Sequence, residues 1–251
     1  MFFRQVLHEE RSCASYLVGC QKKRTCAVID PQGEPGRYLA VAERAGLPVT
    51  HVMDTHVHAD HPSGALALAE ASGAGLYLGE RAEVGFGYRP LRDGEVLPVG
   101  NRRLTVIPTP GHTPEHVCVL VDDWFVLTGD TLFVGDVGRV DLALGEPDDG
   151  ALTARARELH ASLQRLLELP GETELFPGHF SGSTCGRHMD GKPVSTIGRE
   201  RRRNRALAMD VEEFVAFQRE NLPPLPSDFH RIKQENLAGV SPRERTQAPV
   251  T

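Results

Sequence analysis

The chain has 251 residues, with 28 lysines and arginines against 34 aspartates and glutamates, and its formal net charge is -6. This acidic balance argues against non-specific nucleic-acid binding, because that binding relies on lysine and arginine to neutralise phosphates. No apolar run approaches the ~20 residues of a membrane span, and charged residues interrupt the N-terminal segment where a signal peptide is apolar. We therefore expect a cytoplasmic protein that binds neither nucleic acid nor a membrane.

The first half of the chain alternates short β-rich runs with helical runs. Runs of Val, Ile, Phe and Tyr that end at turn or charged residues predict strands at 2–7, 14–19, 25–29 and 49–53. The segments 37–45 and 64–71 predict helices, the first of which ends before a glycine and a proline. Helices between strands favour an α/β architecture, with the helices outside packed sheets.

The second half repeats this alternation. Strands are predicted at 104–107, 116–121, 124–127 and 174–176, and the pair 116–121 and 124–127 should form a hairpin across an Asp-Asp turn. The apolar spacing predicts one long helix at 152–169 and a helix or helix pair over 196–221. No linker divides the chain. We expect one domain over 1–240 and a loose tail over 241–251.

The five cysteines are odd in number and widely spaced, and they form no CxxC pair. We expect them to be reduced thiols rather than a disulfide framework or a zinc ribbon. No basic partner for Cys185 is evident in the sequence, so we interpret it as an ordinary thiol. The basic run from Arg199 to Arg205, with Glu200 interleaved, is interpreted as a solvated helix face.

Residues that can bind a metal follow four of the predicted strands. One strand leads into the motif His-Val-His-Ala-Asp-His, and three others lead into a His or Asp that a glycine precedes. Loops at strand ends present functional side chains, and glycine lets the backbone turn sharply there. Imidazole and carboxylate groups suit zinc, iron or manganese, and one ion needs at least three convergent ligands. The candidate ligands are His56, His58, Asp60, His61, His112, Asp130 and His179.

The remaining six histidines are interpreted as non-ligands, because an isolated histidine is more often a satisfied core or surface residue. They are His8, His51, His116, His160, His188 and His230, among which His116 is nearest to the candidate ligands in pattern.

The ligand motifs together resemble the metallo-β-lactamase superfamily. The motif at 56–61 is followed, in the order of that family, by Gly-His-Thr at 111–113, Gly-Asp-Thr-Leu-Phe at 129–133 and Gly-His at 178–179. The resemblance covers nearly the whole chain and implies a four-layered αβ/βα sandwich with metals at one sheet edge. By position it implies a first metal site and a second, with Asp130 between the two. The first would use His56, His58 and His112, and the second Asp60, His61 and His179.

Further stretches resemble the persulfide dioxygenase branch, in particular bacterial enzymes that are often fused to a rhodanese domain, with glyoxalase II as the near relative. These stretches are 129–142, 178–186, 195–201 together with Asn204, 213–215 and 222–226. The branch implies one Fe(II) per chain, held by His56, His112 and Asp130. His58, Asp60, His61 and His179 would then orient these ligands and hold water.

The implied reaction oxidises glutathione persulfide, or a similar small persulfide, with O2 to sulfite and thiol in sulfide detoxification. The resemblance also leads us to expect a homodimer, and a separate rhodanese or free persulfide as the source of sulfur.

The ligand residues alone leave other functions open. Two Zn(II) ions would hold a hydroxide for hydrolysis of glutathione thioesters, as in glyoxalase II. A non-catalytic metal-binding protein is a third reading, which we disfavour because a structural site needs only a closed shell whereas ligands are in excess here.

Four residues are candidates for contacts with the substrate. Arg139 lies shortly after Asp130 and either binds a substrate carboxylate through two hydrogen bonds or forms an ion pair with Asp136 or Asp141. The polar loop after His179 either contacts the glutathione backbone or is plain surface. Its candidates are Ser183, Thr184 and Lys192.

Overall fold

Two six-stranded sheets form the centre of the fold in the computed structural model, which describes residues 1–142, 148–220, 224–225 and 227–240. The first sheet has the order β1-β2-β3-β4-β5-β6, and the second has the order β12-β11-β10-β9-β8-β7. The strands of the first sheet are β1 (Phe2–His8), β2 (Cys13–Cys20), β3 (Thr25–Ile29), β4 (Val49–Met53), β5 (Gly75–Gly79) and β6 (Arg89–Leu91). Those of the second are β7 (Val96–Val99), β8 (Arg102–Pro108), β9 (Val117–Val121), β10 (Phe125–Gly129), β11 (Glu174–Pro177) and β12 (Ser195–Thr196).

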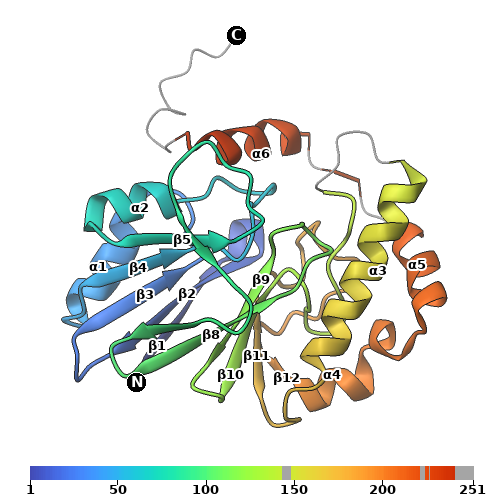
Figure 1. Cartoon of the computed structure of the whole chain (residues 1–251), viewed down its shortest axis with the longest axis horizontal. Helices are drawn as coiled ribbons and strands as arrows, with labels where there is room; N and C mark the ends of the chain where they lie inside the picture. Colours follow the sequence, from blue (N-terminus) through green and yellow to red (C-terminus); the bar gives the residue numbers. More distant parts are fainter. Residues whose placement is uncertain (143–147, 221–223, 226, 241–251) are drawn as a thin grey trace.

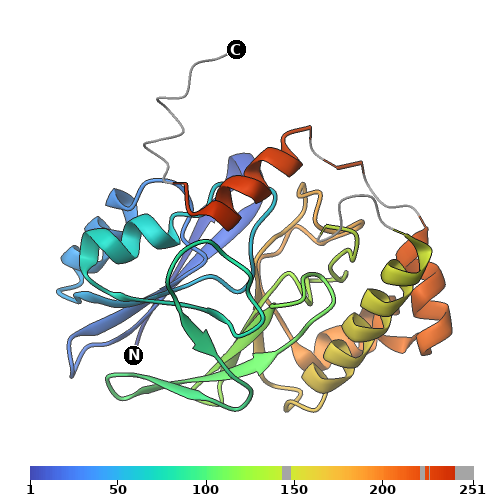
Figure 2. The ribbon, with the colours of Figure 1, turned by 45° about the horizontal axis from the view of Figure 1, so that its top comes forward.

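Helices cover the outer face of each sheet, as Figure 1 shows. The first sheet carries α1 (Gly36–Arg44) and α2 (Ala65–Ser72). The second carries α3 (Asp149–Leu166), α4 (Ile197–Arg203) and α5 (Val211–Arg219). A last helix, α6 (Phe229–Ala238), lies across the top of both halves in Figure 2. Short 3-10 turns are η1 (Glu9–Arg11) and η2 (Arg205–Ala208).

Three buried apolar clusters separate these layers. The central cluster lies between the sheets and includes Tyr16, Ile29, Val119 and Phe125. Another cluster joins α1 and α2 to the first sheet, and a third joins α3, α4 and α5 to the second. Each fully buried large apolar side chain contributes about 1.5–3 kcal/mol relative to an exposed one. The layers therefore follow the order αβ/βα, and the expected four-layered sandwich is confirmed.

Most predicted elements are confirmed, with small shifts at their ends. The hairpin of β9 and β10 turns at Asp122 and Asp123, whose φ values of 51° and 55° suit the two central residues of a tight hairpin turn. The segment 196–221 contains a pair of α-helices rather than one, because Asn204 and Asp210 interrupt it and their side chains cap the elements that follow. Residues 221–223, 226 and the expected tail 241–251 lie outside the described residues.

Four strands and one helix were not predicted, namely β5, β6, β7, β12 and α6, and neither were the two 3-10 turns. The four strands are short; β12 has only two residues, and the other three contain glycine or proline, which weakens a strand pattern. The buried face of α6 consists of Phe229, Ile232 and Asn236, so one of its three core positions is polar and the apolar spacing is broken. No helix among the described residues is long and apolar enough to cross a membrane.

The topology brings several chain segments to one edge of the two sheets. Strands β3, β4, β5 and β6 run parallel, and β10 runs parallel to β11. Their carboxyl ends lead into Asp30, the 54–61 segment, Asp130 and His179. The two halves join at this edge, because the backbone N–H of Ala14 donates to the carbonyl of Gly178. Residues far apart in sequence therefore meet there.

Candidate metal centre

Two histidines and one aspartate from three different loops meet inside the protein. The ligand atoms of His56, His112 and Asp130 lie within 4.8 Å of one another. Asp130 Oδ2 is 3.4 Å from His112 Nε2 and 3.9 Å from His56 Nε2, and each residue is at most 2% exposed. Among the described residues, His112 Nε2 and Asp130 Oδ2 have no hydrogen-bond partner. Since buried polar atoms are normally paired, these three side chains fit a cation that they would share.

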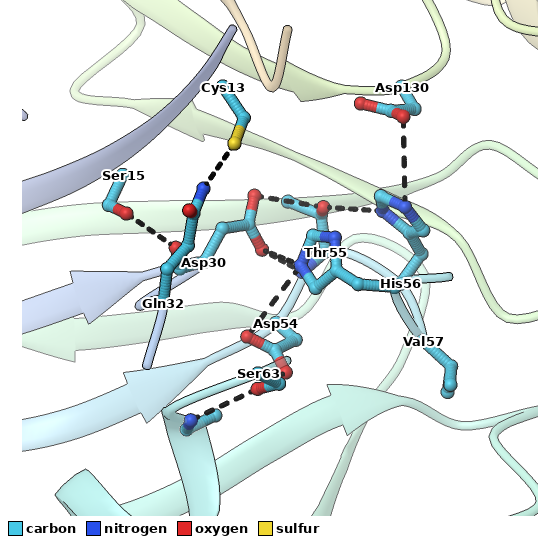
Figure 3. Close-up of polar contacts among 12 residues, drawn as sticks. Cys13, Ser15, Asp30, Gln32, Asp54, Thr55, His56, Val57, Ser63 and Asp130 are labelled. Atoms are coloured by element: carbon cyan, nitrogen blue, oxygen red, sulfur yellow. Dashed lines mark hydrogen bonds and ion pairs between the residues drawn. The ribbon is translucent and has the colours of Figure 1, made fainter. Parts of the chain in front are cut away.

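The hydrogen bonds behind the two imidazoles point their Nε2 lone pairs toward Asp130. The Thr55 hydroxyl donates to Asp30 Oδ2 over 3.0 Å, so its proton is used and it accepts from His56 Nδ1, also at 3.0 Å. Figure 3 shows Thr55 between Asp30 and His56. In the same way, His112 Nδ1 donates to the carbonyl of Arg139 over 2.7 Å. Such outer hydrogen bonds fix the tautomer and orientation of a metal-binding histidine.

The protonation states also suit metal binding. Burial lowers the pKa of His112, and burial together with the neighbouring imidazoles lowers the pKa of His56 well below its ordinary value. Burial alone would raise the pKa of Asp130, but the charge of His179 and its hydrogen bond outweigh this and bring the pKa to about 2. At neutral pH the set is therefore two neutral imidazoles and one carboxylate, the forms in which these groups bind metals.

Close packing explains the glycines that precede Asp130 and His179. Gly129 has a φ of 47°, and a Cβ there would lie 2.5 Å from His116 Nε2 and 2.6 Å from Thr55 Oγ1. A Cβ on Gly178 would lie 2.6 Å from Asp130 Oδ1. Side chains at either position would therefore displace Asp130 or the residues that hold it.

His116 supports the centre without joining the ligand set. Its Nε2 accepts from the backbone N–H of Asp130 over 3.0 Å, and its Nδ1 lies 2.9 Å from the hydroxyl of Thr109 and 3.1 Å from that of Thr131. Both ring nitrogens are thus in use within the protein. Burial lowers the pKa of His116 to about 3, so the ring stays neutral and can accept this bond.

His58 is turned away from Asp130, toward two other carboxylates. Its Nε2 lies 3.4 Å from Asp30 Oδ1 and 3.9 Å from Asp54 Oδ1. Burial disfavours the charged ring, yet the hydrogen bond and charge of Asp30, together with Asp54, raise the pKa of His58 to about 10. The His58 ring lies beside that of His56, with 4.2 Å between the ring centroids, but its nitrogens are grouped with Asp30 and Asp54 rather than with the ligand atoms of His56 and His112. The first metal site that the superfamily pattern implied stays a prediction.

The other expected ligands form a group around His179. His179 Nδ1 is 2.7 Å from Asp130 Oδ1, and its Nε2 is 2.8 Å from Asp60 Oδ2. Burial opposes a charge on this ring, but the two carboxylates outweigh it and raise the pKa of His179 well above its ordinary value. His61 Nδ1 also contacts Asp60 Oδ2, at 2.9 Å, while His61 Nε2 has no partner among the described residues. Cys13 completes this group, a residue that sequence reasoning did not select.

The predicted substrate contacts lie in different surroundings. The Arg139 guanidinium is buried and donates to Asp141 through two hydrogen bonds of 2.6 and 2.7 Å, and to the carbonyl of Thr184. This is the ion pair with Asp141 that the sequence left open. Ser183 and Thr184 are half-buried and Lys192 is exposed. A role of these four residues in substrate binding stays a prediction.

Sequence reasoning missed three residues that hold the centre in place. Asp30 and Thr55 orient His56, and Asn236 of α6 donates 2.9 Å hydrogen bonds to the carbonyls of His58 and His61. Asp30 ends a predicted strand just as the candidate ligands do, so the same signal could have found it. Asn236 has no such signal, because it lies on a helix that the sequence pattern did not reveal.

Two further expectations can be compared with the structure. The five cysteines are free and buried, as expected. The arginines at 199 and 201–203 are exposed on α4, as a solvated helix face requires, whereas the interleaved Glu200 is buried and accepts hydrogen bonds from Gly135 and Ser195.

Comparison with known proteins identifies relatives of the chain. The profile described as "Metallo-beta-lactamase superfamily" matches residues 8–179. A "Beta-lactamase hydrolase-like protein" of Xylella fastidiosa (strain 9a5c) is 32% identical, over 94% of this chain and 60% of its own length. A "Hydroxyacylglutathione hydrolase" of Rhodospirillum rubrum is 34% identical, over 65% of this chain and 60% of its own. The chain thus spans about 60% of the length of these curated relatives.

Other relatives match over most of both chains. "Persulfide dioxygenase ETHE1, mitochondrial" of Bos taurus is 30% identical, over 89% of this chain and 84% of its own length. Among solved structures, ETHE1 from Myxococcus xanthus superposes with a TM-score of 0.83 at 33% identity, over 95% of this chain and 99% of that chain. A metallo-beta-lactamase from Staphylococcus aureus gives a TM-score of 0.88 at 32% identity, over 96% of this chain and 73% of that chain.

Proposed function

Because the chain belongs to the metallo-beta-lactamase superfamily, whose members bind metal ions, we propose that it is a persulfide dioxygenase with one ferrous ion on His56, His112 and Asp130. Its substrate would be glutathione persulfide or a similar small persulfide. The relative in Bos taurus carries the name persulfide dioxygenase, and the chain covers most of that protein, which supports the choice.

The observation that carries the proposal is the unequal use of the histidine nitrogens. In the proposed iron site, one imidazole nitrogen and one carboxylate oxygen are buried without a hydrogen-bond partner among the described residues. In contrast, both nitrogens of His179 contact carboxylates. His58 faces Asp30 and Asp54, although its ring nitrogens, like His61 Nε2, form no hydrogen bond among the described residues. Two histidines and one carboxylate that converge, beside a His179 held between two carboxylates, favour a mononuclear site of the type found in non-heme iron oxygenases.

A ferrous ion held by these residues would supply the redox chemistry with O2. Two histidines and one carboxylate would leave coordination positions open on one face for substrate and oxygen. The protein would contribute the neutral imidazoles of His56 and His112 and the carboxylate of Asp130. His179 Nδ1–H donates a hydrogen bond to Asp130 Oδ1 over 2.7 Å, which leaves Oδ2 directed at the two imidazoles. Because these three side chains are buried, bulk water would be excluded from a substrate bound against them.

The proposed reaction balances without a further reductant. One persulfide, one O2 and one water give one thiol, one sulfite and two protons. The terminal sulfur is oxidised, O2 is reduced and supplies two of the three sulfite oxygens, and the S–S bond breaks with its electron pair passing to the thiol. A separate rhodanese as sulfur source and a homodimer stay predictions.

A thioester hydrolase with two Zn(II) ions is the second candidate. The observation in its favour is the group of Cys13, Asp60, His61 and His179, in which His61 Nε2 has no partner among the described residues. The hydroxyacylglutathione hydrolase of Rhodospirillum rubrum, at 34% identity, is consistent with this candidate. Binding of a second ion would require His179 to give up at least one carboxylate contact.

Metal analysis combined with oxygen uptake separates the two candidates. The protein is purified without added metal, its iron and zinc are measured, and oxygen consumption is followed with glutathione persulfide. We expect about one iron per chain, with sulfite formed in proportion to the oxygen consumed. Two zinc ions per chain, thioester hydrolysis and no oxygen uptake would overturn the dioxygenase and establish the hydrolase.

A further inference from the structure

The stretch that resembles the persulfide dioxygenase branch contributes two buried polar side chains, Glu200 and Asn204, which hold a neighbouring loop. Glu200 accepts a hydrogen bond from the backbone N–H of Gly135 over 2.8 Å. Asn204 Nδ2 donates to the carbonyl of Asp136 over 2.9 Å. Both side chains belong to residues that are at most 2% exposed. Residues 135–139, which we call the 135–139 loop, are therefore fixed from the side of α4.

The 135–139 loop lies directly against two of the proposed ligands. A Cβ on Gly138 would clash with the backbone oxygen of Asp130 and would lie 3.2 Å from His112 Nδ1. One residue further along, the carbonyl of Arg139 accepts the hydrogen bond from His112 Nδ1. A displacement of this loop would therefore move the acceptor that orients His112.

Gln218 of α5 fixes the peptide group between Gly138 and Arg139. Its Nε2 donates to the carbonyl of Gly138 over 3.0 Å. The N–H of the same peptide group, which belongs to Arg139, donates to the carbonyl of Cys185 over 3.1 Å. Gln218 is only 1% exposed, so no bulk water replaces its hydrogen bond if the amide is lost, and the carbonyl of Gly138 would be left unpaired. The peptide that precedes the Arg139 carbonyl is thus held at both ends.

The amide of Gln218 is itself held in one orientation. Arg187 Nη2 donates to Gln218 Oε1 over 3.1 Å and to the main-chain carbonyl of Gln218 over 3.0 Å. The guanidinium of Arg187 also lies over the ring of Phe217, at 4.6 Å from the centroid. Because a guanidinium only donates, it selects the oxygen of the amide and turns the NH2 group toward Gly138.

We propose that Gln218 is a positioning residue for His112, which acts through the Gly138–Arg139 peptide and sets the direction of the His112 Nε2 lone pair. For His56, the neighbouring Thr55 has this role locally, whereas His112 depends on a helix at the outer face of the second sheet. The inference rests on the proposed function only for the identity of the metal, because His112 belongs to the centre in both candidate functions.

Competition with a chelator, measured without oxygen on the iron-loaded protein, tests the proposal. Gln218→Met keeps the approximate volume of the side chain and removes the donor. Gln218→Glu keeps the contact with Arg187 and places an acceptor against the carbonyl of Gly138. We expect each variant to bind iron about tenfold more weakly, the lower end of the effect of groups that orient a ligand.

His160→Leu is the matched control. The His160 ring donates from Nε2 to the carbonyl of Met209 over 3.1 Å, just before α5, rather than to the 135–139 loop. The variant therefore loosens the packing of α5 without touching the peptide that Gln218 holds. Its iron affinity should equal that of the wild type.

NMR of the zinc-substituted protein gives a second measurement, which is independent of activity and uses a diamagnetic ion. In the wild type, the Nδ1 proton of His112 should exchange slowly with water, because it is buried and bonded to the carbonyl of Arg139. In both Gln218 variants this proton should exchange faster, while the Nδ1 proton of His56, which Thr55 accepts, should not change. A merely structural role of Gln218 would alter both protons alike or neither, and would overturn the proposal.

Unchanged iron affinity of the Gln218 variants, or an equal loss in His160→Leu, would also overturn the proposal. If Gln218→Met does not fold, Arg187→Met tests the same contacts, because it removes the group that turns the Gln218 amide. It should weaken iron binding in the same direction, and unchanged binding would contradict the role of Gln218. Two zinc ions and no oxygen uptake, with a zinc affinity that falls in the Gln218 variants, would contradict the dioxygenase and keep this role.

Discussion

Two groups of histidines and carboxylates lie side by side in this protein and share Asp130, yet they differ in how their nitrogens are used. Around His56 and His112, main-chain and hydroxyl acceptors take up the Nδ1 protons, so that both Nε2 atoms remain available. Around His179, carboxylates contact both ring nitrogens. The first group is prepared for a cation, whereas the second already contains its own positive charge.

This difference shows that residue type and sequence position do not decide which histidines bind a metal. An imidazole backed by a neutral acceptor keeps a lone pair for an ion, whereas one placed between two carboxylates becomes protonated and acts as a cation itself. In the second group, the proton on His179 thus provides the positive charge that a metal ion would provide. Substitutions in each group measure whether only the first group binds the metal.

Asp130→Ala should have the largest effect, because it removes the only carboxylate of the first group. We expect iron affinity to fall by more than about 100-fold, the upper end for changes in groups that merely support a ligand, so that the purified variant retains almost no iron. Elemental analysis of wild type and variant measures this.

Asp60→Ala is the matched control, since Asp60 contacts His179 and His61 but none of the three proposed ligands. It should retain iron and show altered turnover. Equal loss of metal in both variants would mean that the two groups form one dinuclear site, and the distinction drawn above would fail.

Thr55→Val should have the next largest effect, because it keeps the shape of the side chain and removes the hydroxyl between Asp30 and His56. The His56 ring then loses the acceptor that fixes its tautomer. Loss of such an outer partner lowers metal affinity by about 10–100-fold, which competition with a chelator measures.

Thr50→Val serves as the control, because Thr50 lies on β4, the strand that leads to Thr55, and its hydroxyl donates to the carbonyl of Cys26 rather than toward the centre. Thr55→Ser should restore most of the affinity. If Thr55→Val binds iron as tightly as Thr50→Val does, the hydroxyl has no part in orienting His56.

Asn236→Ala tests how the loop of the second group is held. The two hydrogen bonds from Asn236 to the carbonyls of His58 and His61 would be lost, leaving buried acceptors unpaired at a cost of about 1–3 kcal/mol in the free energy of unfolding. Chemical unfolding compared with Gln234→Ala, an exposed position on the same helix, measures this. A stability equal to that of the control would show that α6 does not hold this loop.

The alternation of strands and helices predicted an α/β fold with helices outside packed sheets, and the resemblance to the superfamily added the four layers. The carboxyl ends of parallel strands bring His56, Asp130 and His179 to the same sheet edge. The sequence could not predict which way each imidazole turns. That choice depends on Asp30, which directly follows β3 with a left-handed φ of 50° and reaches both Thr55 and His58.

The surroundings of the ligands were less predictable than the ligands themselves. Arg139 was selected because it follows Asp130 closely in sequence, but Asp141 engages its guanidinium, and it is the carbonyl of Arg139 that contacts His112. Gln218, which holds the peptide before that carbonyl, lies on α5 and reaches it only through the packing of this helix. Contacts of this kind depend on tertiary packing and leave no local motif.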